Sequence, residues 1–170
     1  MLRTLVGEHI AMGVEPSAAP LILRADRGLL EQVVMNLVVN ARDAMPSGGQ
    51  LRVQLSRAGD DALLEVRDTG TGMDAKTQEH IFEPFFTTKE TGRGTGLGLS
   101  TVFGIVSQMG GAVSVESAPG AGSTFSVRLP LATGQQVEAA TDAGVRTARP
   151  VAAGTVLVVD DEPAVLALAC

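Results

Sequence analysis

The chain has 170 residues, of which 45% are hydrophobic, and its formal net charge is −6. This length and apolar content suit one domain with a core, together with a fragment of another. The acidic balance argues against nonspecific nucleic-acid binding, and no apolar run reaches the roughly 18 residues that span a bilayer. No signal peptide opens the sequence. A single cysteine, Cys170, excludes an internal disulfide framework, and two histidines, His9 and His80, are too few for a zinc site.

The first predicted elements are a strand and a long helix. Ile10, Met12 and Val14 alternate within residues 1–14, which predicts a strand with His9 on its solvated side. Asp26 is a suitable N-cap for a helix that ends before the turn residues 46–49. The apolar residues of this helix recur with the i, i+3, i+4, i+7 spacing of a core face. That face consists of Leu30, Val33, Val34, Leu37, Ala41 and Ala44.

A narrow polar stripe follows a different face of the same helix. Its residues recur about every four positions and therefore lie above one another. The stripe consists of Gln32, Asn36, Asn40 and Asp43. A solvated surface is one interpretation. However, a third face is already suited to water through Glu31, Met35 and Arg42, so the stripe can instead line a polar cavity.

Two alternating segments predict a pair of strands. Residues 51–56 alternate apolar and polar side chains, residues 59–61 form a turn, and Leu64 and Val66 continue the alternation. Asp68 has the same parity as Val66, so its carboxylate should point to the buried face, where it needs a partner to offset desolvation. The alternative is a turn-forming Asp-x-Gly whose side chain bonds its own backbone.

The middle of the chain carries a glycine-rich loop. A short helix over 75–81 precedes residues 82–89, where three phenylalanines suggest a mobile lid with an aromatic latch. Residues 92–100 then alternate glycine with other residues before an apolar run with helical spacing. A glycine-rich loop that leads into a helix N-terminus can cradle phosphate, although a flexible surface loop is the alternative. The spacing matches neither a Rossmann fingerprint nor a P-loop.

The last third of the chain predicts two strands and a separate tail. Val113 and Val115 form one strand, and Ser123 shares a face with Phe125, Val127 and Leu129 in the next. Residues 130–153 have the composition of a linker. Residues 154–159 are a continuous apolar strand of the kind that parallel sheets bury, followed by acidic residues.

In this order the motifs resemble the ATP-binding catalytic domain of bacterial sensor histidine kinases, from the group that includes DNA gyrase, Hsp90 and MutL. The similar segments are 31–44, 68–73, 81–89 and 92–100, with a weaker match at 120–125. The resemblance covers residues 1–131 and implies an α/β (α+β) two-layer sandwich, with a mixed sheet and helices on one face. Residues 132–153 are then a flexible linker.

The tail has a resemblance of its own. The sequence VLVVDDEP at 156–163 resembles the first strand and acidic pocket of a response-regulator receiver domain, with Asp160 and Asp161 in the pocket. Residues 154–170 would be the N-terminal fragment of that domain. The two resemblances together imply a hybrid histidine kinase, with the receiver's phosphoacceptor aspartate well beyond Cys170.

The resemblance implies that the chain binds Mg-ATP and transfers the γ-phosphoryl group to a histidine in two-component signalling. That histidine belongs to a dimerisation domain, and neither His9 nor His80 matches its motif. The implied partners are this dimerisation domain and a receiver domain or response regulator. The implied location is cytoplasmic, without nucleic acid and without direct membrane contact from this segment.

The resemblance also assigns site residues. It implies that Asn36 and Asn40 act in catalysis, Asn40 as the Mg²⁺ ligand and Asn36 on the phosphate side. Asp68 would accept the adenine amino group, with Ser123 nearby. Asp43 stands where many relatives carry lysine or arginine, so the basic contact to phosphate must come from elsewhere. The remaining ATP-binding residues would be Gly70 and Gly72 beneath the base, and Lys89, Arg93, Gly94, Thr95, Gly96, Leu97 and Gly98 around the phosphates.

Two other functions stay open at this stage. An ATPase resembling gyrase or Hsp90 would carry a glutamate, as the base that activates water, at the position of Asn36. Asparagine cannot act as that base, so hydrolysis should be poor. A nucleotide-binding module without kinase activity is the other alternative, because the chain lacks both phosphoryl acceptors.

Overall fold

The structure is a computed structural model that describes residues 5–89 and 94–132. Arg93, nearly all of the predicted linker and the predicted strand at 154–159 with Asp160 and Asp161 lie outside these residues. The domain boundaries proposed for the tail are therefore not tested by the structure.

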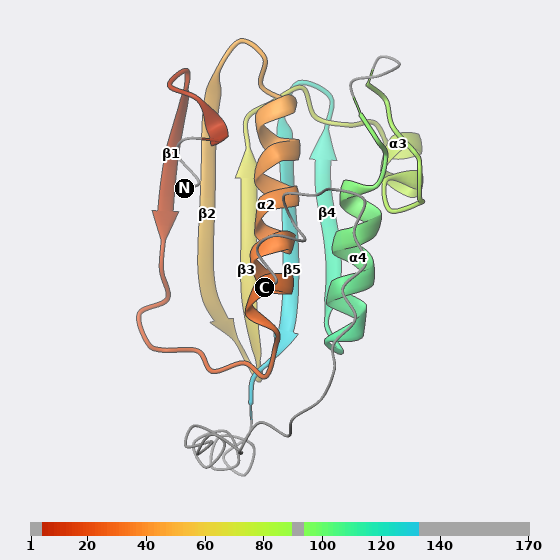
Figure 1. Cartoon of the computed structure of the whole chain (residues 1–170). Helices are drawn as coiled ribbons and strands as arrows, with labels where there is room; N and C mark the ends of the chain where they lie inside the picture. Colours follow the sequence, from red (N-terminus) through yellow and green to blue (C-terminus); the bar gives the residue numbers. More distant parts are fainter. Residues whose placement is uncertain (1–4, 90–93, 133–170) are drawn as a thin grey trace, which may run out of the picture. The chain divides into compact units, whose positions relative to one another are not determined.

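The described chain forms a five-stranded mixed sheet with the order β1-β2-β3-β5-β4 (Figure 1). β1 pairs with β2 in parallel, and the other neighbours are antiparallel. The strands are β1 (Ile10–Glu15), β2 (Gly49–Ala58), β3 (Asp61–Asp68), β4 (Ala112–Ala118) and β5 (Gly122–Pro130).

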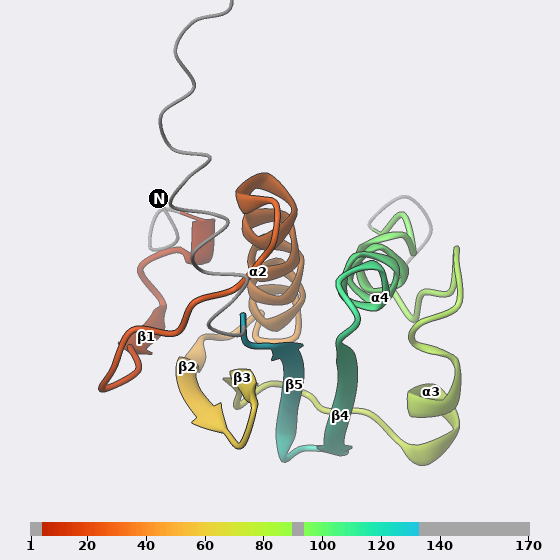
Figure 2. The ribbon, with the colours of Figure 1, turned by 90° about the horizontal axis from the view of Figure 1, so that it is seen from below.

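Helices cover one face of this sheet. The long helix α2 (Arg27–Asp43) and helix α4 (Gly98–Gln108) lie side by side on the same face, as Figure 2 shows along the strands. The short helix α3 (Ala75–His80) lies near β4, beyond the two main helices. This arrangement is the two-layer sandwich that the family resemblance implies.

Helix α2 forms where its sequence signals place it. The Asp26 carboxylate accepts a hydrogen bond from the Leu29 N–H at 3.1 Å, which caps the helix as expected. Val33, Leu37 and Ala41 of the predicted core face are buried, and Val38 is buried as completely as Leu37. The buried face is therefore wider than the spacing alone indicates.

The N-terminal strand is shorter than predicted. It begins at Ile10, whereas Leu5 and Val6 form a helical turn in which Val6 is 1% exposed. Val14, expected on the buried side, is 59% exposed. β1 is an edge strand with a single neighbour, and α2 packs over β2 and β3 instead, so alternation does not guarantee burial at this edge. His9 is exposed, as predicted.

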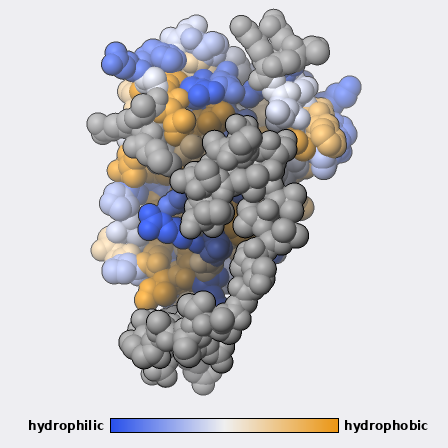
Figure 3. Space-filling model, in the orientation of Figure 1, coloured by the Kyte–Doolittle hydropathy of each residue, from blue (hydrophilic) through white to orange (hydrophobic). Residues whose placement is uncertain are grey.

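The core lies between the helices and the inner face of the sheet. β5 contributes the alternating set that the sequence predicts, and α4 contributes Val102, Ile105 and Val106, all buried. On the face seen in Figure 3, hydrophilic and hydrophobic residues are intermixed in small groups. Within residues 5–89 and 94–132, no helix combines the length and the apolar content that crossing a membrane requires.

Candidate functional site

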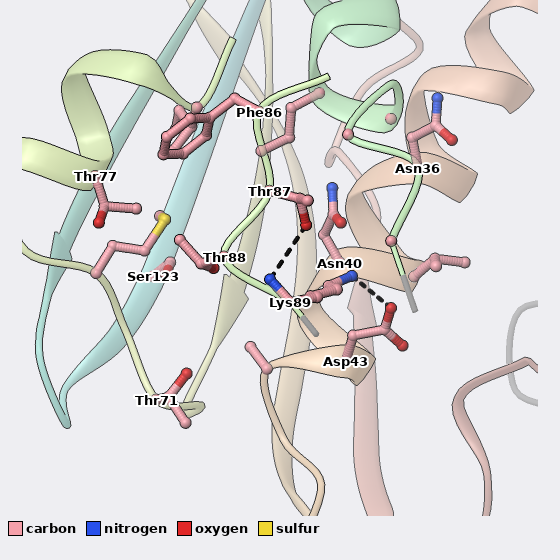
Figure 4. A pocket seen from close by; sticks show the side chains of 18 of the residues that line it. Asn36, Asn40, Asp43, Thr71, Thr77, Phe86, Thr87, Thr88, Lys89 and Ser123 are labelled. Carbon is pink, nitrogen blue, oxygen red and sulfur yellow. Dashed lines mark hydrogen bonds and ion pairs between the residues drawn. The ribbon is translucent and has the colours of Figure 1, made fainter. Parts of the chain in front are cut away.

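A cavity of about 600 Å³ is lined by residues of α2, of the segment 81–89 and of the start of α4. Figure 4 shows polar side chains from α2 and from this segment converging on it. Most of the predicted site residues line it. These are Asn36, Asn40, Asp43, Asp68, Gly72, Lys89, Gly94, Thr95, Gly96, Gly98 and Ser123.

Two of the predicted site residues that the structure describes, Leu97 and Gly70, are not part of the cavity wall. Arg93 lies outside the described residues. Leu97 is 41% exposed and immediately precedes α4. Gly70 packs against the end of α2 instead, where an added Cβ would lie 2.5 Å from the Ala44 carbonyl oxygen. The close approach of these two backbones is by itself a sufficient reason for glycine at this position. Gln32 of the polar stripe is exposed and also stands outside the wall.

Asp68 forms a buried, charged end of the cavity. The residue is 2% exposed, as its parity predicts, and its carboxylate accepts the Gly70 N–H at 2.8 Å. This bond is also the local turn contact that the alternative interpretation predicts, so both interpretations hold. Burial raises the pKa of Asp68, while hydrogen bonds from the backbone of Gly70 and Ser123 oppose part of that rise.

A second layer of hydrogen bonds supports this end. The Ser117 hydroxyl accepts the Met73 N–H at 2.9 Å, donates to the Gly122 carbonyl at 2.8 Å, and lies 3.0 Å from the Ser123 hydroxyl. The Gln78 amide donates to the carbonyls of Met73 and Ser117. Neither Ser117 nor Gln78 was predicted from the sequence. For Ser117 the signal was available, because it has the same parity as Val113 and Val115.

Asn36 and Asn40 line the cavity at the side that faces α4. A Cβ at Gly98, the first residue of α4, would lie 3.7 Å from Asn40 Nδ2 and 3.9 Å from Asn36 Oδ1. Asn40 Nδ2 is buried and has no hydrogen-bond partner among the described residues. Buried amide N–H groups are generally hydrogen-bonded, so this nitrogen is a donor available to a polar group in the cavity.

The helix α4 begins at this same side. No described side chain caps its first turn. The first N–H groups of a helix have no intrahelical partners, and they carry the positive end of the helix dipole. The helix N-terminus that the glycine-rich loop predicts is thus present at the cavity, beside the two asparagines.

The loop before α4 is held against the segment 81–89 by its backbone. Phe85 N–H donates to the Gly96 carbonyl at 2.9 Å. Gly96 has a positive φ of 65°, and a Cβ there would collide with the Phe85 carbonyl carbon. Backbone packing therefore requires glycine at this position, in addition to any contact with a ligand.

The three phenylalanines of the segment 81–89 differ in their packing and exposure. Phe82 and Phe86 pack against the core, and Phe82 stacks at a tilt on Phe103 with ring centroids 5.7 Å apart. Phe85 is 75% exposed and adopts a positive φ of 67°. The predicted three-residue aromatic latch is therefore wrong for Phe85, because its backbone is turned toward Gly96 while its ring remains in solvent.

Three charged side chains meet at the end of α2. Lys89 Nζ lies 2.6 Å from one carboxylate oxygen of Asp43, and Arg42 donates to the other oxygen at 2.9 and 2.7 Å. Partial burial acts to raise the pKa of Asp43, but hydrogen bonds and charge from Lys89 and Arg42 outweigh it and lower that pKa. Lys89 thus places a basic group beside position 43, at the wall of the cavity.

Fold and cavity together define a class of protein: a two-layer α/β sandwich with a cavity between its helices and its sheet. One end of this cavity is a buried carboxylate, and the other combines amides, a lysine and a helix N-terminus. Comparison with known proteins agrees with this class. The family described as histidine kinase-, DNA gyrase B- and HSP90-like ATPase matches residues 25–133, and the chain belongs to this family.

Individual relatives are sensor kinases. The chain is 44% identical to the sensor kinase CckA of Brucella abortus over 193 aligned residues, which cover 97% of this chain and 20% of that protein. It is 41% identical to the signal transduction histidine-protein kinase AtoS of Escherichia coli, over 64% of this chain and 18% of that protein. The chain thus spans about a fifth of these relatives.

Solved structures show the same fold. The mycobacterial sensor histidine kinase MprB superposes with a TM-score of 0.65 at 30% identity, over 72% of this chain and 83% of that chain. Full-length ShkA, solved in complex with AMPPNP, superposes with a TM-score of 0.68 at 30% identity, over 78% of this chain and 30% of that chain. The predicted fold class is thus confirmed.

Proposed function

We propose that this chain is the catalytic ATP-binding domain of a sensor histidine kinase, which transfers the γ-phosphoryl group of Mg-ATP to a histidine on a dimerisation domain. The observation that carries the proposal is the division of the cavity into two chemically different ends. Asp68 gives one end an acceptor, and Asn36, Asn40, Lys89 and the start of α4 give the other end donors. A nucleotide has the matching polarity, with an amino group on the base and anionic phosphates.

The base would bind at the Asp68 end. A buried carboxylate with only backbone N–H partners retains acceptor capacity for a further donor, and the exocyclic amino group of adenine is such a donor. Ser123 lies beside it, supported by Ser117. Gly72 lines the cavity and would lie beneath the ring, although packing alone already requires glycine there, because a Cβ would collide with the Ala118 carbonyl oxygen.

The phosphates and Mg²⁺ would bind at the Asn40 end. Mg²⁺ takes few protein ligands and keeps several waters, so one amide oxygen together with phosphate oxygens is sufficient. The described residues contain no cluster of three or more histidine, cysteine or acidic side chains that could hold a metal alone. The buried Nδ2 of Asn40, a donor without a partner among those residues, would donate to a phosphate oxygen, and its Oδ1 would be the atom that holds an ion brought in with the nucleotide. Such an ion would neutralise charge on the phosphates.

Transfer to a histidine is favoured over hydrolysis of ATP. Hydrolysis requires a base to activate water near the γ-phosphate. The described residues that line the cavity include two carboxylates: Asp68 is at the base end, and Asp43 is paired with Lys89 and Arg42. Asn36 cannot accept the proton. Catalysis by this domain would therefore consist of positioning and charge stabilisation.

The test combines binding and transfer. Calorimetry should show that the chain binds ATP and ADP reversibly. The binding of ATP should depend on Mg²⁺. Radiolabelled ATP should then label a separately purified dimerisation hairpin in the presence of the chain, and a hairpin with its histidine replaced should stay unlabelled. Binding without labelling would leave a nucleotide-binding module, and phosphate released faster than it is transferred would favour the ATPase.

We also propose that residues 1–131 form this domain, that 132–153 are a linker, and that 154–170 begin a receiver domain in a hybrid kinase. The support is the VLVVDDEP sequence and the alignment with CckA, which reaches 97% of this chain whereas that with AtoS reaches 64%. Reading the coding sequence beyond Cys170 tests this proposal. A receiver should show its phosphoacceptor aspartate at the end of a later strand, and unrelated sequence there would refute the hybrid.

A further inference from the structure

Asp43 occupies an unusual place for an acidic residue, because it lines the cavity at the end that would receive phosphates. Its two carboxylate oxygens have separate partners. One oxygen accepts two hydrogen bonds from the Arg42 guanidinium at 2.9 and 2.7 Å, and the other accepts Lys89 Nζ at 2.6 Å. Figure 4 shows Lys89 reaching from its segment to the end of α2 where Asp43 lies.

Arg42 in turn is tied to a different part of the chain. Its Nη1 donates to the Leu5 carbonyl at 3.2 Å, in the helical turn that precedes β1. Leu5, Arg42, Asp43 and Lys89 therefore form one continuous series of polar contacts. It runs from the N-terminal turn, through the last turn of α2, to the segment above the cavity.

The side chains in this series are only partly exposed. The exposed fractions are 36% for Arg42, 24% for Asp43 and 34% for Lys89. By contrast, the other ion pair of α2, Arg27 with Glu31, is 92% and 53% exposed and lies away from the cavity. Charged hydrogen bonds hold geometry best where both partners are fixed and water is partly excluded.

We propose that Asp43 is a positioning residue, which fixes the ammonium group of Lys89 at the phosphate end of the cavity and docks the segment 86–89 onto α2. Arg42 holds the Asp43 carboxylate in the orientation that this requires. The inference rests on the proposed function, because Lys89 would contact the phosphates of the nucleotide. It adds a role for a residue whose own charge repels those phosphates.

A positioning role and a simple charge effect predict opposite changes in nucleotide affinity when Asp43 is removed. If Asp43 acted only through its negative charge, its removal would strengthen the binding of an anionic nucleotide. If Asp43 positions Lys89, its removal should weaken that binding, although a repulsive charge has been lost. The expected loss is about fivefold, which is the upper end of the contribution of an exposed ion pair, because this pair is partly buried.

The experiment measures the affinity of the full chain for Mg-ATP and for adenosine by calorimetry. Asp43→Asn should lower the affinity for Mg-ATP by about fivefold. It should lower the affinity for adenosine by less than about twofold, since adenosine has no phosphates. Lys89→Met should have a similar pattern, and the double variant should lose little more than Lys89→Met alone. Asp43→Glu should restore part of the affinity. Glu31→Gln is the matched control, because it removes an acidic partner of arginine from the same helix away from the cavity.

Hydrogen exchange without nucleotide gives an independent readout. The amides of residues 86–89 should exchange faster in Asp43→Asn than in the wild type, whereas Glu31→Gln should leave them unchanged. Unchanged exchange in Asp43→Asn would overturn the docking role, even if that variant were less stable overall.

The outcomes distinguish this inference from the proposed function. A wild-type chain that binds Mg-ATP, with an Asp43→Asn variant that binds it equally or more tightly, would overturn the positioning role and leave the proposed function standing. A wild-type chain that binds neither Mg-ATP nor adenosine would refute the proposed function and with it the contact of Lys89 with phosphate.

Discussion

Replacing Asp68 with asparagine tests the proposed base-binding end most directly. The substitution keeps the shape of the side chain and an oxygen that can accept the Gly70 N–H, but it removes the charge that an adenine amino group would meet. Asp68 is 2% exposed, so water cannot easily replace the lost acceptor. A hydrogen bond to a charged group contributes about 1.5–3 kcal/mol, which corresponds to a loss of roughly 10- to 150-fold in affinity.

Calorimetry with Mg-ATP and with adenosine is the assay for this variant. Both ligands should lose affinity by the same factor, because both carry the base, and this distinguishes Asp68→Asn from the variants at the phosphate end. Circular dichroism and urea unfolding should show that the variant is folded. A folded Asp68→Asn protein with wild-type affinity for adenosine would refute the assignment of Asp68.

The pH dependence gives the same reasoning a second test. Burial raises the pKa of Asp68 in the free protein, whereas an adenine amino group favours the ionised form. Affinity for adenosine should therefore fall as the pH decreases through this raised pKa, at a higher pH than for an ordinary aspartate. Without ligand the sign for stability is opposite. Because the folded-state pKa lies above the unfolded one, the free energy of unfolding should fall as the pH rises between the two values, and Asp68→Asn should lack this change.

Three further predictions concern other parts of the chain. Asn40→Ala should reduce phosphoryl transfer to a histidine hairpin more than it reduces adenosine affinity, because Mg²⁺ acts on the phosphates; wild-type transfer rates at low Mg²⁺ would exclude Asn40 as the ligand. Ser117→Ala should lower the free energy of unfolding in urea by about 1–3 kcal/mol, since the partly buried Met73 N–H loses its acceptor, whereas Ser114→Ala, at an exposed position, should change it little. Deleting residues 133–170 should leave Mg-ATP affinity unchanged, and a tenfold loss would show that the tail contributes to the site.

The inward position of several site residues could be predicted from local periodicity. Alternation along a strand places Asp68 and Ser123 on the buried face, and both are buried in the structure. Helical spacing places Asn36 and Asn40 on one face, and both line the cavity. These predictions succeed because the direction of a side chain within a strand or helix follows from backbone geometry alone.

Periodicity was insufficient where the environment of an element decides burial. Val14 alternates correctly with Ile10, yet it is exposed because β1 is an edge strand that α2 does not cover. Gln32 has the spacing of the polar stripe, but it lies outside the cavity because the cavity extends along only part of α2. Which part of a helix faces a ligand depends on the neighbouring elements rather than on the helix itself.

The sequence by itself determined the order of the elements along the chain, the inward direction of Asp68, and the shared helix face of Asn36 and Asn40. Each of these depends on backbone geometry within one strand, helix or turn. Only the tertiary structure decided that Asp43 pairs with Lys89, 46 residues away, and that Gly96 is required by the backbone of Phe85. The physical reason is that such partners meet only after α2, the segment 81–89 and α4 have packed onto one sheet. No local sequence pattern predicts which distant side chain will then be within hydrogen-bonding distance.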